Sequence, residues 1–310
     1  MLRYYRLNGH VKEIKNSAEY KEANLIKMVD PQYEDIYKIS KKERIIHEYL
    51  KDSLDKNEIP RLENYKNQLF LLIRVPTEDD NKPGNLTFKT TPMGIILTPE
   101  KLILIASEDM NIIDVVINNY GKKFESIRSF VMMVLLATTK RYLKYLKTLN
   151  INIIRAEARL RKTQSNQELI NLMEIEKSLV YFTTSLKGNQ MVMERLLSGK
   201  LSENDEEKEF IRDVIIENNQ ALEMSQLYNN IVDSLTSAFS SIISNNLNIV
   251  MKALAALTII LNFPMLVSSV YGMNVPLPFQ NQKYAFIIVI AISIVLTMLS
   301  TWYLIKRKWF

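Results

Sequence analysis

The chain has 310 residues, of which 40 are Lys or Arg, 34 are Asp or Glu, two are His and none is Cys, and its formal net charge is +6. The lack of cysteine excludes disulfides and thiolate metal sites, and two distant histidines, His10 and His47, argue against a zinc site or a Ser-His-Asp triad. Any bound metal ion is therefore expected to use oxygen ligands, which favours hard cations such as Mg²⁺.

Residues 1–125 are predicted to form a cytoplasmic α+β domain, that is, an α/β segment with a mixed or antiparallel sheet. Short strands are predicted over residues 68–75, 86–91, 93–97 and 101–106. The last two are expected to form a hairpin through residues 98–100. Ser40 is predicted to be the N-cap of a helix whose apolar residues recur at helical spacing over residues 45–54.

The same segment lacks the features of a secreted protein or of a nucleotide-dependent enzyme. Residues 1–15 contain no apolar stretch like that of a signal peptide, so secretion is not expected. The chain has seven glycines, and none forms a glycine-rich phosphate loop. Because no nucleophile, base and phosphate loop occur together, we do not expect an enzyme.

Long helices are predicted after this domain, because the 164 residues between Pro99 and Pro264 contain no proline. Residues 126–204 are predicted to form a helical hairpin of two amphipathic helices, parted near residues 164–166. A stalk helix is predicted over residues 205–252, with no stop signal before the membrane. If this helix continues to Tyr271, its length is on the order of 100 Å.

The stalk carries apolar residues at alternating spacings of four and three, which is a heptad pattern. We call these positions the stalk seam: Met224, Tyr228, Ile231, Leu235, Ala238 and Ile242. Packing against the preceding helices and self-association of several copies explain this pattern equally well.

Two transmembrane helices are predicted at the C-terminal end. Residues 253–282 carry no charge, and residues 284–305 form a second uncharged run, so the first span is placed at 253–274 and the second at 284–305. The external loop covers residues 275–283 and the basic cytoplasmic tail residues 306–310.

Charge also predicts how these spans are oriented. After Lys252 there is no acidic residue, and the positive charges cluster in the tail, so both termini are expected to be cytoplasmic. The first 252 residues hold 36 basic and 34 acidic groups, a net charge of +2. The overall +6 is therefore not a nucleic-acid footprint, and no nucleic-acid partner is expected.

One face of the first span is small or polar. Its positions alternate at spacings of three and four: Asn248, Met251, Ala255, Thr258, Asn262, Met265 and Ser269. An amide such as that of Asn262 near the middle of a span is costly unless it faces a partner or water. Helix association explains this stripe and is favoured by the stripe alone; a pore built from several copies is the other interpretation.

The first span ends in Tyr271, Gly272, Met273 and Asn274. A helix C-cap would explain the glycine alone. The Gly-Met-Asn tripeptide after the first of two C-terminal spans resembles the signature of the CorA magnesium transport proteins. The resemblance extends through residues 244–254, the basic tail and the overall order of α/β domain, helices, stalk and two spans.

This resemblance implies a homopentameric channel whose first spans line the pore and whose second spans form an outer ring. Gly272, Met273 and Asn274 would form the entrance, where amide and carbonyl oxygens hold the hydrated ion through its waters. The implied pore-lining residues are Asn248, Met251, Leu254, Thr258, Asn262, Met265 and Ser269. Met251 and Leu254 would form an apolar constriction. The family pattern places Leu254 in the pore, whereas the periodicity places Ala255 there.

The resemblance also implies regulation by cytoplasmic Mg²⁺ bound between subunits. Asp213, in Arg212-Asp213-Val214, matches the stalk half of that site, and Asp52, eight residues before Pro60, matches the half on the α/β domain. The other interpretation of each aspartate is a solvated surface charge.

The chain departs from the family pattern at two places. The external loop has no acidic residue, so attraction of cations to the pore mouth is expected to be weaker. The residue before Asp52 is Lys51 rather than an acid, so the site between subunits is expected to be weaker or arranged differently.

The sequence therefore predicts a multi-pass protein of a bacterial or archaeal plasma membrane that carries Mg²⁺ inward down the electrochemical gradient. Its expected partners are further copies of itself, the lipid bilayer and divalent cations. Transport of Co²⁺, Ni²⁺ or Zn²⁺ is the alternative within the class, although the zinc-exporting branch usually reads Gly-Ile-Asn where this chain has Met273. A non-conducting two-span signalling protein is the alternative outside it.

Overall fold

The computed structural model describes residues 1–8, 10–14, 20, 22–79, 87–120, 126–163, 166–199, 205–279, 283–307 and 309. The chain divides into two compact units, Met1–Leu235 and Thr236–Phe310, and each is described by itself.

The first unit contains a seven-stranded sheet. Its strands are β1 (Leu2–Asn8), β2 (His10–Ile14), β3 (Leu25–Val29), β4 (Arg61–Tyr65), β5 (Gln68–Glu78), β6 (Phe88–Leu97) and β7 (Leu102–Ala106). Their order is β2-β1-β3-β7-β6-β5-β4, and only the β3–β7 pair is parallel. This confirms the predicted mixed sheet and the hairpin between β6 and β7, which Thr98 closes by donating its backbone N–H to the Lys101 carbonyl at 2.8 Å.

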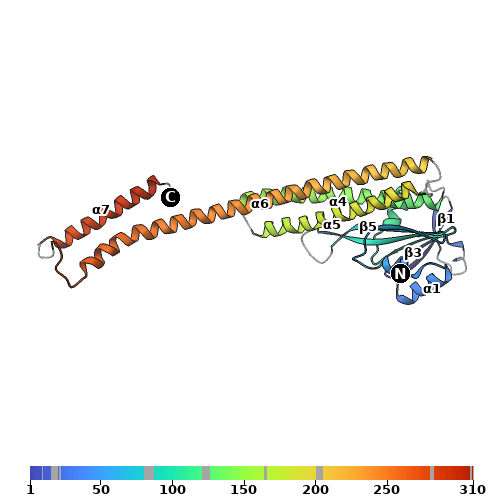
Figure 1. Ribbon diagram of the computed structural model, residues 1–310, viewed down its shortest axis with the longest axis horizontal. Coiled ribbons are helices and arrows are strands. Elements are labelled where there is room, and N and C mark those ends of the chain that lie inside the picture. Colours follow the sequence, from blue (N-terminus) through green and yellow to red (C-terminus); the bar gives the residue numbers. More distant parts are fainter. Residues whose placement is uncertain are drawn as a thin grey trace. The chain divides into compact units, whose positions relative to one another are not determined.

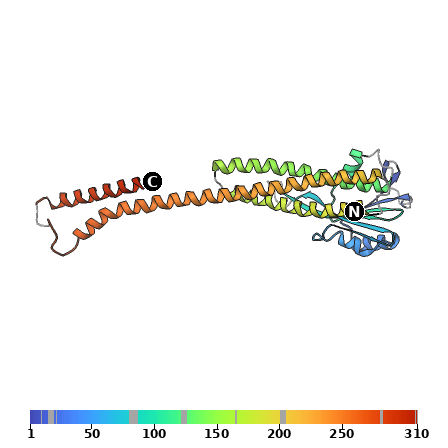
Figure 2. The same cartoon turned by 45° about the horizontal axis from the view of Figure 1, so that its top comes forward.

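Helices cover both faces of this sheet (Figures 1 and 2). Along β5, Leu71 and Ile73 belong to one core cluster and Phe70 and Leu72 to the other, as the two-residue period of a strand requires. Helices α1 (Tyr33–Lys42) and α2 (His47–Asp52) cover the Phe70 face. Helices α3 (Ile112–Tyr120), α4 (Ile127–Thr163) and α5 (Asn166–Ser198) cover the other face, together with the first part of α6 (Asp205–Tyr271).

Two local predictions are wrong. The two strands predicted on either side of Pro92 are one strand, β6, over the described residues; Leu86 lies outside them. The proline is tolerated because β7 ends opposite Met93, which leaves Pro92 with a strand neighbour on one side only. Ser40 is not an N-cap: it lies inside α1, and its hydroxyl donates to the Ile45 carbonyl at 2.8 Å instead of accepting an amide N–H.

Hydrogen bonds from the helices complete the edge of β5 where β4 has ended. Asn189 on α5 accepts the backbone N–H of Arg74 at 2.8 Å and donates to the Arg74 carbonyl at 2.8 Å, as a neighbouring strand would. Tyr142 on α4 donates to the same carbonyl at 2.9 Å. These buried side chains satisfy the backbone of β5 and set the position of both helices on the sheet.

Helix α6 packs against α5 in the first unit. Asn218 donates to the Leu186 carbonyl at 3.1 Å, and Ser225 donates to the Leu179 carbonyl at 3.1 Å. Both side chains are fully buried. Each of these small polar side chains thus donates a hydrogen bond from α6 to a backbone carbonyl of α5 across the contact between the two helices.

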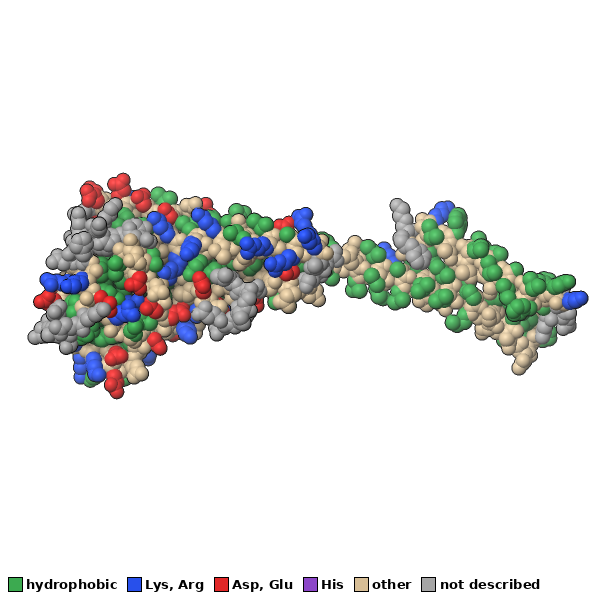
Figure 3. Space-filling model, turned by 180° about the vertical axis from the view of Figure 1, so that it is seen from behind, with side chains coloured by type: hydrophobic (Ala, Val, Ile, Leu, Met, Phe, Trp, Pro, Cys, Tyr) green, Lys and Arg blue, Asp and Glu red, His purple; other side chains and the backbone are tan. Residues whose placement is uncertain are grey.

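The second unit consists of the remainder of α6, a short connection and α7 (Ala285–Lys306). Within the described residues, α6 and α7 are the helices long and apolar enough to cross a membrane. Figure 3 shows a largely hydrophobic surface over this unit, in contrast to the mixed charges of the first unit. At the end of α7, Lys306 lies over the Trp302 ring and Arg307 over the Tyr303 ring, which suits an interfacial anchor.

Candidate pore and cation sites

The small, polar stripe of α6 is exposed on the single chain. The predicted pore-lining residues with exposed side chains are Asn248, Met251, Leu254, Thr258, Asn262, Met265 and Ser269. Ala255 is exposed as well, so exposure does not decide whether Leu254 or Ala255 lines the pore. Thr258 directs its hydroxyl back to the Leu254 carbonyl at 2.9 Å, as is common for threonine in apolar helices.

This stripe is not the face of α6 that packs within its own unit. The buried side chains of α6 in its apolar part are Ala256 and Val267, and α7 contributes Leu304. Ala256 and Thr258 are two residues apart, which is about 200° around a helix of 3.6 residues per turn. Packing against the chain's own second span therefore does not account for Asn262, and only other copies, lipid or water remain as its neighbours.

The Gly-Met-Asn segment forms the turn that ends α6. Gly272 donates its N–H to the Ser268 carbonyl at 2.9 Å, and Met273 donates to the Val270 carbonyl at 3.2 Å. A Cβ added to Gly272 would lie 3.3 Å from the Ser268 carbonyl oxygen, and its φ is not in the left-handed region. Within one chain, a side chain at position 272 would therefore meet only a mild steric conflict. Close approach of another molecule would be a stronger reason for glycine at this position.

Asn274 presents its side chain to solvent beyond this turn. Tyr271 donates its hydroxyl to the Pro278 carbonyl at 3.3 Å and so closes the connection after the motif. The amide oxygen of Asn274 is the kind of hard, neutral ligand that can bind the waters of a hydrated divalent cation. The turn therefore offers one such ligand for each copy of the chain.

Asp52, the first predicted cation ligand of the large unit, already has a positively charged partner. Its carboxylate lies 2.6 Å from Arg61, and Glu58 and Glu63 lie 2.6 Å from the same guanidinium. Burial lowers the pKa of Arg61, but Glu63, Glu58 and Asp52 outweigh it and raise that pKa. With three carboxylates and one guanidinium the cluster keeps a formal charge of −2, so a cation can still be attracted to it.

Asp213, the second predicted ligand, is exposed on α6 between the buried Ile211 and Val214. This part of α6 is strongly acidic: residues 205–235 contain eight Asp or Glu and two Lys or Arg, a net charge of −6. Among the described residues, no three His, Asp or Glu side chains are grouped so as to hold a metal ion. In the described part of one chain, Asp213 thus lacks the further ligands that a cation site needs.

The sheet separates the elements that carry the two aspartates. The buried residues of α2, which ends at Asp52, belong to the core on the α1 side of the sheet. Ile211 and Val214, which flank Asp213, belong to the core on the opposite side. A site that uses both carboxylates therefore requires two copies of the chain.

The stalk seam is a second feature of α6 that is partly exposed on the single chain. The residues of α6 buried against the preceding helices are Ile211, Val214, Asn218, Ala221, Ser225 and Val232. The seam lies on another face, where Ile231 is 37% and Ile242 42% exposed. Met224, Tyr228 and Leu235 are half-buried, so packing within the chain accounts for part of the seam. Self-association would account for the exposed Ile231 and Ile242.

The sequence did not single out Arg61 or Arg74, although both organise the segment beside Asp52. Arg74 donates to the carbonyls of Lys56 and Glu58 at 3.0 and 2.8 Å and to the Thr90 carbonyl at 2.6 Å. In the sequence, Arg61 stands between two acidic residues, Glu58 and Glu63, and this pattern could have indicated its ion pairs. No local signal marked Arg74, because its partners come from distant segments.

An α+β unit followed by two apolar C-terminal helices, the first of which is the 67-residue α6, is the arrangement expected of a membrane protein with a large part outside the bilayer. The model of the family described as "CorA-like Mg2+ transporter protein" matches residues 21–307. The Cobalt/magnesium transport protein CorA of Methanocaldococcus jannaschii is 27% identical over 288 residues, which cover 90% of this chain and 89% of that protein. The protein of the same name from Thermotoga maritima is 21% identical over 267 residues, covering 84% and 75%.

The fold agrees with these matches. The complete structure of the CorA magnesium transporter from Methanocaldococcus jannaschii superposes with a TM-score of 0.86 and 24% identity, covering 100% of this chain and 99% of that one. This chain belongs to the CorA-like Mg²⁺ transporter family, a family of membrane transporters. The predicted fold class and the family resemblance are thereby confirmed.

Proposed function

We propose that this protein is a homopentameric channel that admits Mg²⁺ to the cytoplasm down its electrochemical gradient. In this proposal the α6 helices of five copies surround the pore, the α7 helices form an outer ring, and both termini lie in the cytoplasm. The names of the curated relatives, which describe cobalt and magnesium transport, support this choice of substrate.

The observation that carries the proposal is the position of the polar stripe on α6. Asn262 is exposed near the middle of an apolar helix and lies away from the side on which Ala256 and Val267 are buried. An amide facing hydrocarbon would be costly, so the stripe needs a polar environment that the single chain does not provide. A ring of α6 helices around water supplies that environment.

The pore entrance is proposed at Gly272, Met273 and Asn274. Five Asn274 amides would bind the first-shell waters of Mg²⁺, which loses these waters reluctantly. Because the external loop has no acidic residue, capture would depend on neutral dipoles rather than on fixed negative charge. Further along, Met251 and Leu254 would form an apolar ring that closes the pore when it dewets.

The membrane potential is sufficient to drive this transport. A divalent cation gains roughly 4.6 kcal/mol on crossing 100 mV, at about 2.3 kcal/mol per charge. No nucleotide-hydrolysing site and no enzymatic activity are part of the proposal.

Co²⁺ is the second proposed substrate, because both curated relatives carry cobalt in their names. Ni²⁺ and Zn²⁺ have no comparable support. A ligand set of amide and carbonyl oxygens around a hydrated ion would discriminate between these cations mainly through hydration and geometry.

The test is flux of Mg²⁺ into liposomes that contain the purified protein and a Mg²⁺-sensitive dye. We expect flux in the wild type, at least a tenfold loss in Asn274→Ala, and unchanged flux in Asn230→Ala, an exposed amide of α6 that is on neither the stripe nor the stalk seam. A wild type without flux of any divalent cation would support a non-conducting signalling protein instead and would overturn the proposal.

We also propose that cytoplasmic Mg²⁺ closes this channel by binding between subunits, with Asp213 of one copy near Asp52 of the next. The net charge of −2 around Arg61 and of −6 along residues 205–235 supports cation binding where such surfaces meet. A bound cation would reduce the repulsion between them, and its loss would loosen the ring.

A further inference from the structure

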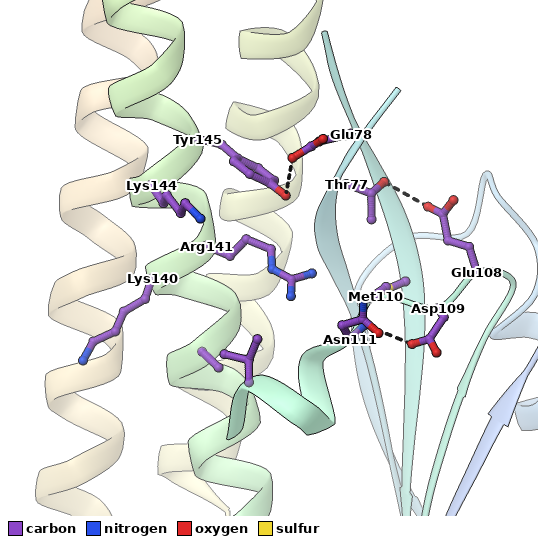
Figure 4. A pocket seen from close by; sticks show the side chains of 12 residues that line it. Thr77, Glu78, Glu108, Asp109, Met110, Asn111, Lys140, Arg141, Lys144 and Tyr145 are labelled. Carbon is purple, nitrogen blue, oxygen red and sulfur yellow. Dashed lines mark hydrogen bonds between the residues drawn. The ribbon is translucent and has the colours of Figure 1, made fainter. Parts of the chain in front are cut away.

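A polar pocket of 660 Å³ lies in the first unit, away from the proposed pore and cation sites. It is formed between α4 and the segment that follows β7 (Figure 4). Its α4 wall carries Lys140, Arg141, Lys144 and Tyr145, and its other walls carry Glu78, Glu108, Asp109 and Asn111. Its volume is within the range of about 300–1,000 Å³ that small-molecule sites occupy.

Two of these three acidic groups, Glu108 and Asp109, already have positively charged partners, and Glu78 accepts a hydrogen bond from the Tyr145 hydroxyl at 3.4 Å. Glu108 forms an ion pair with Lys89 at 3.1 Å and accepts a hydrogen bond from Thr77 at 2.9 Å. Asp109 forms an ion pair with the buried Lys27 at 2.8 Å. These two carboxylates therefore need no cation from a ligand.

Arg141 is in the opposite situation. Its guanidinium is half-buried and extends from α4 into the pocket (Figure 4), and among the described residues no carboxylate forms an ion pair with it. Burial lowers the pKa of Arg141, and Tyr145 and Glu78 only partly offset that effect. A charge withdrawn from water without a partner is unfavourable, so an anion in the pocket would be stabilised beside it.

The charge of α4 strengthens this conclusion. The 37 residues of the helix include nine Lys or Arg and a single acidic residue, Glu157. Such an excess creates a positive potential that raises the local concentration of anions. A divalent cation in the pocket would instead be repelled by Arg141 and Lys144.

We propose that this pocket binds a phosphorylated small molecule of nucleotide size. Arg141 would bind a phosphate group through its planar fork, and Lys144 would add a second positive charge. Inorganic phosphate would fill only a small part of the pocket. The remainder of the ligand would reach Glu78 and Asn111, which offer hydrogen-bond acceptors and a donor.

The experiment is isothermal titration calorimetry of the full-length protein in detergent with ATP in the presence of EDTA, which keeps the nucleotide free of metal. We expect binding to the wild type, at least tenfold weaker binding to Arg141→Gln, and several-fold weaker binding to Lys144→Gln. Lys147→Gln is the matched control, since Lys147 is an exposed lysine of the same helix outside the pocket, and its affinity should stay within twofold. Adenosine and inorganic phosphate should each bind at least tenfold more weakly than ATP.

Three results would overturn the proposal: no heat of binding, equal weakening by the Lys147→Gln control, or adenosine binding as tightly as ATP. Lys144 is exposed, so Lys144→Gln decides the matter if Arg141→Gln does not fold. Without ligand, Arg141→Met should unfold at the same temperature as the wild type or higher, because it removes a charge that forms no ion pair with a carboxylate of the described residues. A lower temperature would mean that Arg141 has a partner within the protein. Binding is measured without ion flux, so this test and the test of conduction can fail independently.

Discussion

Glu108 illustrates how hydrogen bonds and burial compete at a single residue. Burial raises the pKa of its carboxyl group, but hydrogen bonds from Thr91, Thr77 and Lys89 outweigh burial and lower the pKa below its ordinary value of 4.5. The folded protein therefore binds this proton more weakly than the unfolded chain does. The stability that Glu108 contributes is fully present above pH 4.5 and is lost as the pH falls through the lowered pKa.

We predict that Glu108→Gln flattens the acid dependence of stability. The wild type should lose stability as the pH is lowered from about 6 towards 3.5, and the variant should lose less over this range because one linked proton is removed. Thermal unfolding midpoints measured by circular dichroism at a series of pH values provide the check. Glu100→Gln, at an exposed turn residue, is the control and should keep the wild-type slope; an equal slope in Glu108→Gln would contradict the prediction.

At the scale of elements, α5 depends on a glycine for its close approach to the segment before β4. A Cβ added to Gly188 would lie 2.6 Å from Pro60 Cγ, which is closer than real side chains approach. Alanine is favoured over glycine in a helix by about 1 kcal/mol, so the steric conflict and the helix propensity oppose each other. The contact is with a rigid ring, and we expect the conflict to dominate.

Gly188→Ala should therefore lower the free energy of unfolding by about 1–3 kcal/mol, the usual effect of overpacking. Chemical denaturation of Gly188→Ala, Pro60→Ala and the double variant measures the coupling between the two positions. The alanine should be tolerated once Pro60 is shortened. If Gly188→Ala is equally destabilising in both backgrounds, the contact with Pro60 is not the cause.

Helix α6 presents two different faces along the stalk. One is buried against α5 and the sheet-facing core, and the other is the stalk seam, whose Ile231 and Ile242 are exposed on the single chain. Exposed apolar residues at heptad spacing are typical of helices that associate. The chain contains no cysteine, so a single introduced cysteine reports only on contacts between copies.

We predict that Ile231→Cys forms a disulfide between two chains under mild oxidation, because copies of the seam would meet around a common axis. Non-reducing gel electrophoresis of membranes should show a band at twice the chain mass. Gln226→Cys, exposed on the opposite side of α6, should remain monomeric on the gel. Equal cross-linking at both positions, or none at Ile231, would argue against the seam as a contact between copies.

At the scale of the whole molecule, the proposed regulation depends on bringing Asp213 and Asp52 together from different copies. The sheet separates the elements that carry them in one chain, and Arg61 competes for Asp52 at 2.6 Å. Binding of Mg²⁺ at this place would therefore be linked to assembly. A half-buried Asp52 with a competing guanidinium and an exposed Asp213 indicate a site of modest affinity.

Asp213→Ala should reduce the inhibition of flux by Mg²⁺ on the cytoplasmic side, because one carboxylate of each site is lost. Flux into liposomes at increasing internal Mg²⁺ measures the effect, and Glu223→Ala, another exposed acid of α6, is the control. Removal of Mg²⁺ with EDTA should also accelerate trypsin cleavage of the wild type and have little further effect on Asp213→Ala. Unchanged inhibition in this variant would remove Asp213 from the sensor.

Local patterns in the sequence were enough to predict several parts of this protein. Hydropathy and charge predicted both apolar helices, and the gap in proline predicted the long helices. Helix α4 ends at Thr163 and α5 begins at Asn166, on either side of the predicted break. The Gly-Met-Asn tripeptide and the order of elements were sufficient for the family. These features could be predicted because helix periodicity, hydropathy and turn residues are properties of neighbouring residues.

Only the tertiary structure decided which residues meet across long distances in the chain. Three features join segments that lie far apart in the sequence and share no periodic pattern. They are the parallel pairing of β3 with β7, the hydrogen bonds between Asn189 and Arg74, and the pocket around Arg141. Each of the first three strands contains charged residues and gave little strand signal until its neighbours were known. Burial and strand pairing depend on the whole fold. The ability of Asp52 to bind a cation depends on it as well, because the ion pair with Arg61 competes with such binding.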